Sequence, residues 1–235
     1  MQLYYIKSGC RDILPHLVDA MKDNTLYWED YAEFAGVSDA TRFPQEVLSR
    51  FAGKRILDIR GGVGKHIAEL KGKDLRVNLE ISSKRLLWGK KLYPAIHPIQ
   101  ASAYMLPFKS CSFDTVVMID VIEHLDTPQK AVQEIYRVLE KRGVLILQTP
   151  NYPIKRLYDF YKGWKKKKPF ADDPTHSSKF GWRSLRAVIS KYFAIELLRT
   201  RNIFGEKKIS TFKRFRKSKI GLILGQKTII IARKI

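Results

Sequence analysis

The stretch from Arg55 to Leu70 constrains the fold more than any other part of this sequence. It begins with a short apolar run that holds one acid, Asp58, and continues through a loop with three glycines into an amphipathic segment. This order predicts a buried strand, a tight turn and the start of a helix, the unit from which nucleotide-binding α/β folds are built. Glycines let the backbone approach a ligand closely, and the start of a helix presents unpaired N–H groups.

A second acid supports a nucleotide site. Glu80 lies sixteen residues after Gly64, at the end of a second apolar strand. An acid in this position accepts hydrogen bonds from ribose hydroxyls. A dinucleotide fingerprint would place a small residue at position 67, where this chain has Ile67. A Walker loop would place Ser or Thr at position 66, where this chain has His66. Neither a nicotinamide dehydrogenase nor a nucleotide triphosphatase is therefore favoured.

The loop from Asp58 to Gly64 resembles the Asp/Glu-x-Gly-x-Gly-x-Gly loop of class I S-adenosylmethionine (SAM) dependent methyltransferases. Three later segments are similar to that family's adenine loop, to its fourth strand with the loop after it, and to its fifth strand with the turn before it. In the family's order these segments are 101–108, 112–125 and 137–151. The Glu-His-Leu and Thr-Pro-Asn elements within them are most similar to small-molecule and quinone-type methyltransferases.

The resemblance implies a set of SAM-binding residues: Asp58, Arg60, Gly61, Gly62, Gly64, Glu80, Ile81, Ser102, Ala103 and Asp120. Two of them depart from the family pattern. Arg60 replaces the first glycine of the loop, and Ser102 replaces an Asp that commonly accepts the adenine amino group. The Arg60 guanidinium has two reasonable positions: it pairs with an acid of the N-terminal segment, such as Glu29 or Asp30, or it fills the space of the methionine tail. We expect the first.

Two histidines are candidate catalytic residues. His124 follows the predicted fourth strand, at the edge where open α/β sheets bind ligands. His176 lies in a segment that resembles a substrate-side loop of quinone-type relatives. An imidazole is a suitable general base near neutral pH, although packing beside SAM is an equal reading of His124. His16, His66 and His97 are interpreted as structural or solvated.

Strand and helix alternate along the chain, which predicts a doubly wound, mostly parallel α/β sheet. The family resemblance implies seven strands that end in an antiparallel hairpin. We expect one domain, with an N-terminal helical cap (1–54), a SAM-binding core (55–151) and a basic substrate-side region with closing strands (152–235). The predicted strands are 55–59, 75–80, 96–100, 113–119, 143–149, 194–199 and 227–233, and the predicted helices include 43–51, 127–139 (with Thr127 as N-cap) and 184–192.

The charge is large and unevenly placed. The chain carries a net charge of +21, and residues 151–235 hold 23 Lys and Arg against 5 Asp and Glu, a net charge of +18. Lysines and aromatic residues alternate around Lys165–Lys168 and Lys207–Lys219. Such segments fit RNA, through phosphates and stacked bases, or an acidic membrane surface, and a solvated surface is the third alternative.

Other features narrow the class of protein. No apolar run approaches the roughly 20 residues that span a membrane, and we expect no signal peptide, because the first residues lack a long apolar core and a small-residue cleavage site. The two cysteines, Cys10 and Cys111, form no disulfide framework, so a reduced, cytoplasmic protein is expected. Neither the cysteines nor the five histidines have the sequence spacing of a metal site, and no metal is predicted.

These observations predict a SAM-dependent methyltransferase that modifies an oxygen or nitrogen of an unidentified, small-molecule acceptor. Two alternatives stay open. One is a SAM-binding or degenerate protein without turnover, which Arg60 and Ser102 suggest. The other is an RNA-binding or RNA-modifying protein that uses its basic C-terminal third.

Overall fold

The computed structural model describes residues 43–235 except 153, 166, 168–174 and 204–224. Residues 1–42 of the predicted N-terminal cap, including Glu29 and Asp30, therefore lie outside the described residues. The segment Lys207–Lys219 also lies outside them. The lysine cluster Lys165–Lys168 is described in part.

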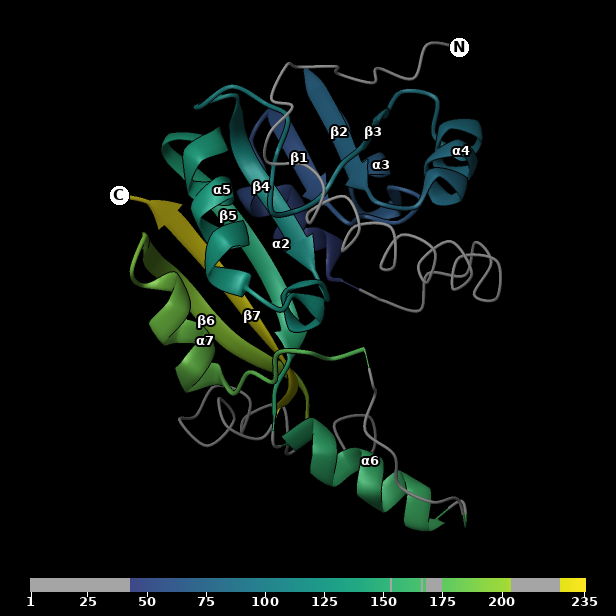
Figure 1. Ribbon diagram of the computed structural model, residues 1–235, viewed down its shortest axis with the longest axis vertical. Coiled ribbons are helices and arrows are strands. Elements are labelled where there is room, and N and C mark those ends of the chain that lie inside the picture. The colour runs from purple at the N-terminus through teal and green to yellow at the C-terminus, as the bar shows by residue number, and fades with distance from the viewer. Residues whose placement is uncertain (1–42, 153, 166, 168–174, 204–224) are drawn as a thin grey trace, which may run out of the picture.

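The described chain builds a seven-stranded sheet of order β3-β2-β1-β4-β5-β7-β6 (Figure 1). Neighbouring strands from β3 to β5 run parallel, whereas β7 is antiparallel to both β5 and β6. The predicted fold class is thus confirmed, including the late antiparallel hairpin. The strands are β1 (Arg55–Ile59), β2 (Leu75–Glu80), β3 (His97–Gln100), β4 (Phe113–Ile119), β5 (Leu139–Pro150), β6 (Phe193–Ile203) and β7 (Gly225–Lys234).

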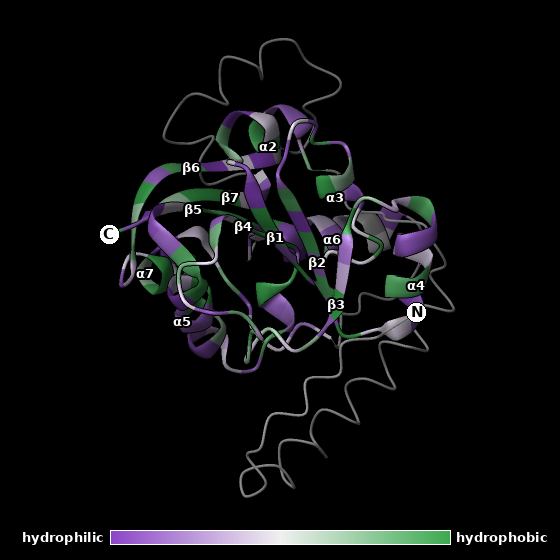
Figure 2. Cartoon of the chain, turned by 90° about the horizontal axis from the view of Figure 1, so that it is seen from above, coloured by the Kyte–Doolittle hydropathy of each residue, from purple (hydrophilic) through white to green (hydrophobic). Residues whose placement is uncertain are grey.

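Helices cover both faces of the sheet, so its central strands are apolar on both sides. In β4, Val116 and Met118 pack in one core cluster with α5 (Pro128–Val138) and α7 (Trp182–Ile189). Val117 and Ile119 belong to a second cluster, with α2 (Gln45–Phe51) and α3 (Lys65–Ala68). Figure 2 shows these two helix pairs on opposite sides of the sheet. Alternate residues of a strand therefore face different helical layers, as a doubly wound sheet requires.

Helix α5 shows how the pattern of apolar residues fixes an element. Its buried residues, Ala131, Val132, Ile135 and Val138, recur at helical spacing and form one stripe. Pro128 stands in the first turn, where its missing N–H costs nothing. Thr127 occupies the N-cap position as predicted, but its side chain makes no capping hydrogen bond.

Some boundaries differ from the predicted ones. β5 starts at Leu139 rather than at residue 143, because Leu139 pairs with Phe113 before an irregularity in the β4–β5 register. Arg142, just before Gly143, has a left-handed φ of 65°, so the predicted turn is a kink within a longer strand. α7 begins at Trp182, two residues early, where the Gly181 N–H donates to Ser184 Oγ.

Asn151, at the end of β5, joins the two halves of the sheet. It is buried, and its N–H and Nδ2 donate to the carbonyls of Gln226 and Gly225, both at 2.7 Å. Its Oδ1 accepts from the Trp182 N–H at 3.2 Å, and its carbonyl accepts from the N–H of Lys155 in α6 (Ile154–Lys165) at 2.9 Å. One side chain and its backbone thus tie β5 to α6, α7 and β7.

Helix α6 projects away from the sheet (Figure 1). Four of its large apolar or aromatic residues are exposed, and the Trp164 side chain is the most exposed of them, at 74%. They are Leu157, Phe160, Tyr161 and Trp164. In the part of the chain that the structure describes, no helix has both the length and the apolar character to cross a membrane. The cytoplasmic location stays a prediction.

Candidate functional site

The loop after β1 has the geometry of a ligand cradle. Arg60, Gly62 and Gly64 adopt left-handed backbone conformations, with φ of 54°, 59° and 83°. Glycine suits such conformations, whereas Arg60 adopts one at a steric cost. At Gly61 the constraint is space: an added Cβ would lie 2.5 Å from the Asn78 Oδ1 atom. A Cβ at Gly62 would meet only the Arg85 guanidinium, at 3.5 Å, so this side of the loop has room for a ligand.

Glu80 fastens this loop to the end of β2. Its Oε2 accepts from the Gly62 N–H at 3.1 Å, and its Oε1 accepts from the N–H groups of Ile81 and Ser82 at 2.7 and 3.2 Å. A carboxylate has about four acceptor positions. Among the described residues three are used by backbone donors, which leaves one position on Oε2 for a ribose hydroxyl. The predicted ribose acid is therefore also a structural clamp.

The Arg60 side chain lies near two acids, Glu80 and Glu123. Burial lowers the pKa of its guanidinium, and the negative charge of Glu80 is the strongest opposing influence, with Glu123 also raising it. Among described residues, the Arg60 charge therefore lies within electrostatic reach of both acids. The predicted partners Glu29 and Asp30 lie outside the described residues, so that pairing stays a prediction.

Two side chains of α5 hold the backbone of the predicted adenine loop. Glu134 accepts from the Leu106 N–H at 2.8 Å, and Arg137 donates to the carbonyls of Phe108 and Leu106 at 2.6 and 2.8 Å. The Ser102 hydroxyl accepts from the Tyr104 N–H at 3.2 Å, and Ala103 is buried. The loop is thus rigidly positioned beside β3 and β4. The roles of Ser102 and Ala103 toward adenine stay predictions.

Asp120 begins the loop after β4, with a left-handed φ of 52°. Its carboxylate forms an ion pair with Lys227 of β7 and accepts a weak hydrogen bond from the Gln148 side chain. The antiparallel strand β7 therefore supplies a cation to this edge of the sheet. Nothing in the sequence placed Lys227 beside Asp120, because the register of β7 on β5 decides it.

The two predicted catalytic histidines lie together. The rings of His124 and His176 contact each other edge to face, with centroids 4.8 Å apart. The Nδ1 of His124 lies 2.9 Å from the Thr175 carbonyl, and the Nδ1 of His176 lies 2.5 Å from the Tyr152 hydroxyl. Sequence spacing gave no sign of this contact, because the fold joins two segments that are distant in the sequence.

The segment that carries His176 is anchored to the loop after β4. The Ser178 N–H donates to the Glu123 carbonyl at 2.9 Å, and the Ser178 hydroxyl donates to the Leu125 carbonyl at 2.7 Å. These bonds place His176 against the short helix η1 (Ile122–His124). The histidine pair thus belongs to one packed unit.

Sequence reasoning missed Glu123. Its side chain is 1% exposed and accepts from the Thr149 hydroxyl at 2.8 Å. Burial, reinforced by the negative charge of Asp120, raises the pKa of the Glu123 carboxyl to about 8. The available signal was an acid flanked by apolar residues directly before His124. Such a strongly shifted carboxyl beside two imidazoles is typical of functional sites.

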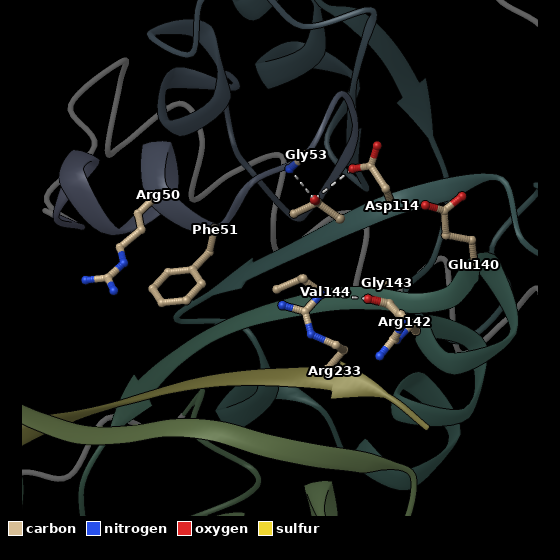
Figure 3. Close-up of a pocket in the computed structure, with 10 residues that line it drawn as sticks. Arg50, Phe51, Gly53, Asp114, Glu140, Arg142, Gly143, Val144 and Arg233 are labelled. Carbon is tan, nitrogen blue, oxygen red and sulfur yellow. Dashed lines mark hydrogen bonds between the residues drawn. The ribbon is translucent and has the colours of Figure 1, made fainter.

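The structure also has a polar pocket of about 230 Å³ at the other edge of the sheet, where β1 and β4 begin. Figure 3 shows Asp114 and Arg233 among its lining residues. Asp114 accepts from the N–H groups of Lys54 and Arg55, both at 2.8 Å, and Thr115 accepts from the Gly53 N–H at 2.8 Å. These groups serve the start of β1. Open α/β sheets bind ligands at the carboxyl ends of their strands, and the glycine loop lies there.

A family profile described as a methyltransferase domain matches residues 57–147. These residues contain the glycine loop, Glu80, the adenine loop and the loop after β4, in the geometry described above. Residues 57–147 form a methyltransferase domain. The predicted family is confirmed for this segment, and the class I methyltransferases that it resembles use SAM as their cofactor.

Among curated relatives, a ubiquinone/menaquinone biosynthesis C-methyltransferase of Ruegeria sp. is 31% identical over 122 residues, which is 46% of this chain and 49% of the relative. A demethylmenaquinone methyltransferase of Clavibacter sepedonicus is 31% identical over 122 residues, 47% of this chain and 48% of the relative. The chain thus spans about half the length of the curated relatives it matches.

Solved structures extend the similarity beyond this methyltransferase domain. A protein of Pyrococcus horikoshii superposes with a TM-score of 0.60 at 17% identity, over 88% of this chain and 91% of that protein. A SAM-dependent methyltransferase of Thermotoga maritima, described as a possible histamine N-methyltransferase, gives a TM-score of 0.58 at 21% identity, over 94% and 99% of the two chains. At these identities the likeness concerns the fold.

Proposed function

We propose that this protein transfers a methyl group from SAM to an oxygen or nitrogen of a small-molecule acceptor that sits over the His124–His176 pair. The observation that carries the proposal is the pair itself. Two histidines with suitable chemistry meet at the carboxyl-terminal edge of the sheet, next to the loop that the family uses for SAM.

The residues on the cofactor side fit SAM. Gly61 and Gly62 give the loop its close packing and its open face, and Glu80 keeps one acceptor position for a ribose hydroxyl. The set proposed from the sequence is completed by Asp58, Arg60, Gly64, Ile81, Ser102, Ala103 and Asp120. SAM supplies an already activated methyl group when bound, so the protein mainly aligns the acceptor, excludes water and moves one proton.

The histidines provide that proton movement. If the Nδ1–H of His124 donates to the Thr175 carbonyl, the lone pair of its neutral ring lies on Nε2. That nitrogen is a suitable base for an acceptor hydroxyl or amine. The Tyr152 hydroxyl contacts the Nδ1 of His176 and orients that ring as well. We propose a phenolic, quinol-like ring as the first acceptor to test, because the curated relatives are described as a ubiquinone/menaquinone biosynthesis C-methyltransferase and a demethylmenaquinone methyltransferase. Because the first of these is a C-methyltransferase, a carbon of the ring is the alternative acceptor atom.

A transfer assay tests this function. SAM with a labelled methyl group is incubated with a panel of hydroquinones, catechols and aromatic amines, and mass spectrometry locates the methyl on O, N or C. We expect His124→Asn to lower turnover by about 10²–10⁴-fold, as the loss of a general base does. The matched control is His97→Asn, an exposed histidine on β3. SAM binding without transfer to any acceptor in the panel would favour the reading as a degenerate protein.

Helix α6 favours an additional partner, and we propose an acidic membrane surface. Its exposed Leu157, Phe160 and Trp164 lie among basic residues, including exposed Arg156 and Lys165. Aliphatic and aromatic side chains beside cations suit an anionic lipid interface, whereas a leucine does not stack on bases. Sedimentation with vesicles is the test: binding is expected with acidic lipid and not with neutral lipid, and Trp164→Ala weakens it. Salt-sensitive RNA binding in place of vesicle binding would contradict the proposal.

A further inference from the structure

We propose that Glu123, His124 and His176 together bind one divalent transition-metal ion at the carboxyl-terminal edge of the sheet. Each residue offers one ligand atom, and the three atoms lie within 4.8 Å of one another. Two come from the helix η1 and the third from the segment between α6 and α7. Two imidazoles and one carboxylate on a single face form a recurrent metal-binding set.

Each of the three side chains has an outer partner of the kind that orients metal ligands. The His124 Nδ1 contacts the Thr175 carbonyl, the His176 Nδ1 contacts the Tyr152 hydroxyl, and Glu123 Oε2 accepts from the Thr149 hydroxyl. A ligating histidine usually donates its second N–H to such an oxygen, which fixes the tautomer and the ring plane. The same arrangement on three side chains at once is therefore an argument independent of their proximity.

The spacing is compatible with coordination. Metal–ligand bonds of about 2.0–2.2 Å place neighbouring ligand atoms about 3–3.5 Å apart. The ligand atoms here are up to 4.8 Å apart. To bind one ion, the side chains must therefore move their ligand atoms closer together by about 1 Å. Rotation about side-chain bonds of the two half-buried histidines supplies such shifts without moving the sheet.

The charges around the cluster also favour a cation. Glu123 is 1% exposed, so its charged form would be costly without a cation, and metal binding would release the proton of its carboxyl group. The positive charge of Lys227 is directed to Asp120 by their ion pair. Arg60 lies within electrostatic reach of Glu80 as well as Glu123. The repulsion between a divalent ion at Glu123 and the side chains of Lys227 and Arg60 is therefore reduced by Asp120 and Glu80.

The donor set selects the metal class. Two nitrogens and one oxygen suit Zn²⁺, Mn²⁺, Fe²⁺ or Co²⁺, whereas Ca²⁺ and Mg²⁺ prefer all-oxygen sites. Three protein ligands leave open positions, as in catalytic metal sites.

A role for the ion rests on the proposed function. An acceptor hydroxyl held at an open position of the ion would have a lowered pKa and would lose its proton to water. Its oxygen lone pair would then form the new bond to the methyl carbon while the carbon–sulfur bond breaks and the bonding electrons stay on sulfur. The ion would thus assist the proton loss for which the metal-free protein uses the His124 imidazole.

Metal titration of the chelator-treated, full-length protein tests the site without any acceptor. We expect calorimetry with Zn²⁺ to give one site per chain, and Co²⁺ to give visible absorption bands from a nitrogen-rich site. His176→Ala should lower Zn²⁺ affinity at least 100-fold, and Tyr152→Phe, which removes only an outer contact, by about 10–100-fold. His97→Ala is the matched control and should bind like the wild type. Because Glu123→Gln changes a buried side chain and risks misfolding, the two milder variants carry the test.

Saturable 1:1 binding that His176→Ala abolishes and His97→Ala preserves would support the site. A wild-type protein without saturable Zn²⁺ or Co²⁺ binding, or a His176→Ala variant that binds like the wild type, would overturn it. SAM binding is measured in parallel on each variant. Loss of SAM binding in the wild type would refute the proposed function and leave the metal result standing, so the two failures are distinguishable.

Discussion

Replacing Glu80 with glutamine tests the clamp that holds the cofactor loop. The carboxylate accepts three backbone N–H bonds, two on Oε1 and one on Oε2. In its best orientation the glutamine oxygen keeps the bonds from Ile81 and Ser82, and its NH₂ group then faces the Gly62 N–H. One charge-assisted bond, worth about 1.5–3 kcal/mol, is lost, and the remaining two weaken to neutral bonds. We expect the free energy of unfolding to fall by about 3 kcal/mol by this count.

Denaturant unfolding measures the stability, and calorimetry measures SAM affinity, which we expect to fall by about 10–100-fold, or 1.4–2.8 kcal/mol. Glu69→Gln is the matched control, because Glu69 is exposed and its replacement should change stability by less than about 0.5 kcal/mol. If Glu80→Gln keeps both the stability and the SAM affinity of the wild type, the clamp does not hold the loop and the cofactor assignment loses its main support.

Three further substitutions test neighbouring features. Gly61→Ala forces a Cβ against the buried Asp58 and Asn78 side chains and should cost about 1–3 kcal/mol of stability, as thermal unfolding would measure. The hydrogen bond from Arg137 lowers the pKa of Glu134, so its stabilisation is present above the unfolded carboxyl pKa of about 4.3 and is lost in acid. Glu134→Gln should therefore destabilise at pH 7, and in denaturant unfolding its difference from the wild type should shrink as the pH falls below the lowered pKa of Glu134. Arg60→Gly removes the cost of a left-handed conformation at a non-glycine residue, about 1 kcal/mol. It should change SAM affinity, measured by calorimetry, by less than about tenfold. A wild-type protein that fails to bind millimolar SAM while the glycine variant binds it would contradict this expectation.

The sequence predicted the cofactor half well because its signals are local. The strands 55–59, 75–80 and 113–119 match β1, β2 and β4 residue for residue. Each is a short apolar run next to a glycine, an acid or a polar turn, and burial on both faces leaves little ambiguity. The helix predicted at 127–139 differs from α5 by one residue at each end.

The acceptor half was less predictable because its contacts are distant in the sequence. The pairing of His124 with His176, the burial of Glu123 and the Lys227–Asp120 ion pair all depend on how the chain after β5 packs back onto the loop after β4. Sequence spacing carries no signal for such contacts. The contact between the two histidine rings is one example, because 51 residues separate His124 from Thr175, whose carbonyl it contacts.

The bonds of Asn151 have a consequence for recombination between proteins of this fold. Everything before Asn151 contains the cofactor loops, and everything after it contains His176, α6 and β7. This one residue contacts Gly225, Gln226, Trp182 and Lys155, and the antiparallel pairing of β7 with β5 fixes the same alignment a second time. A chimaera that exchanges residues 152–235 should therefore fold when the incoming segment presents backbone groups to Asn151 and a strand to β5 at the same places. Because Glu123 and His124 come before Asn151 and His176 comes after it, such an exchange replaces one side of the acceptor site and keeps the other.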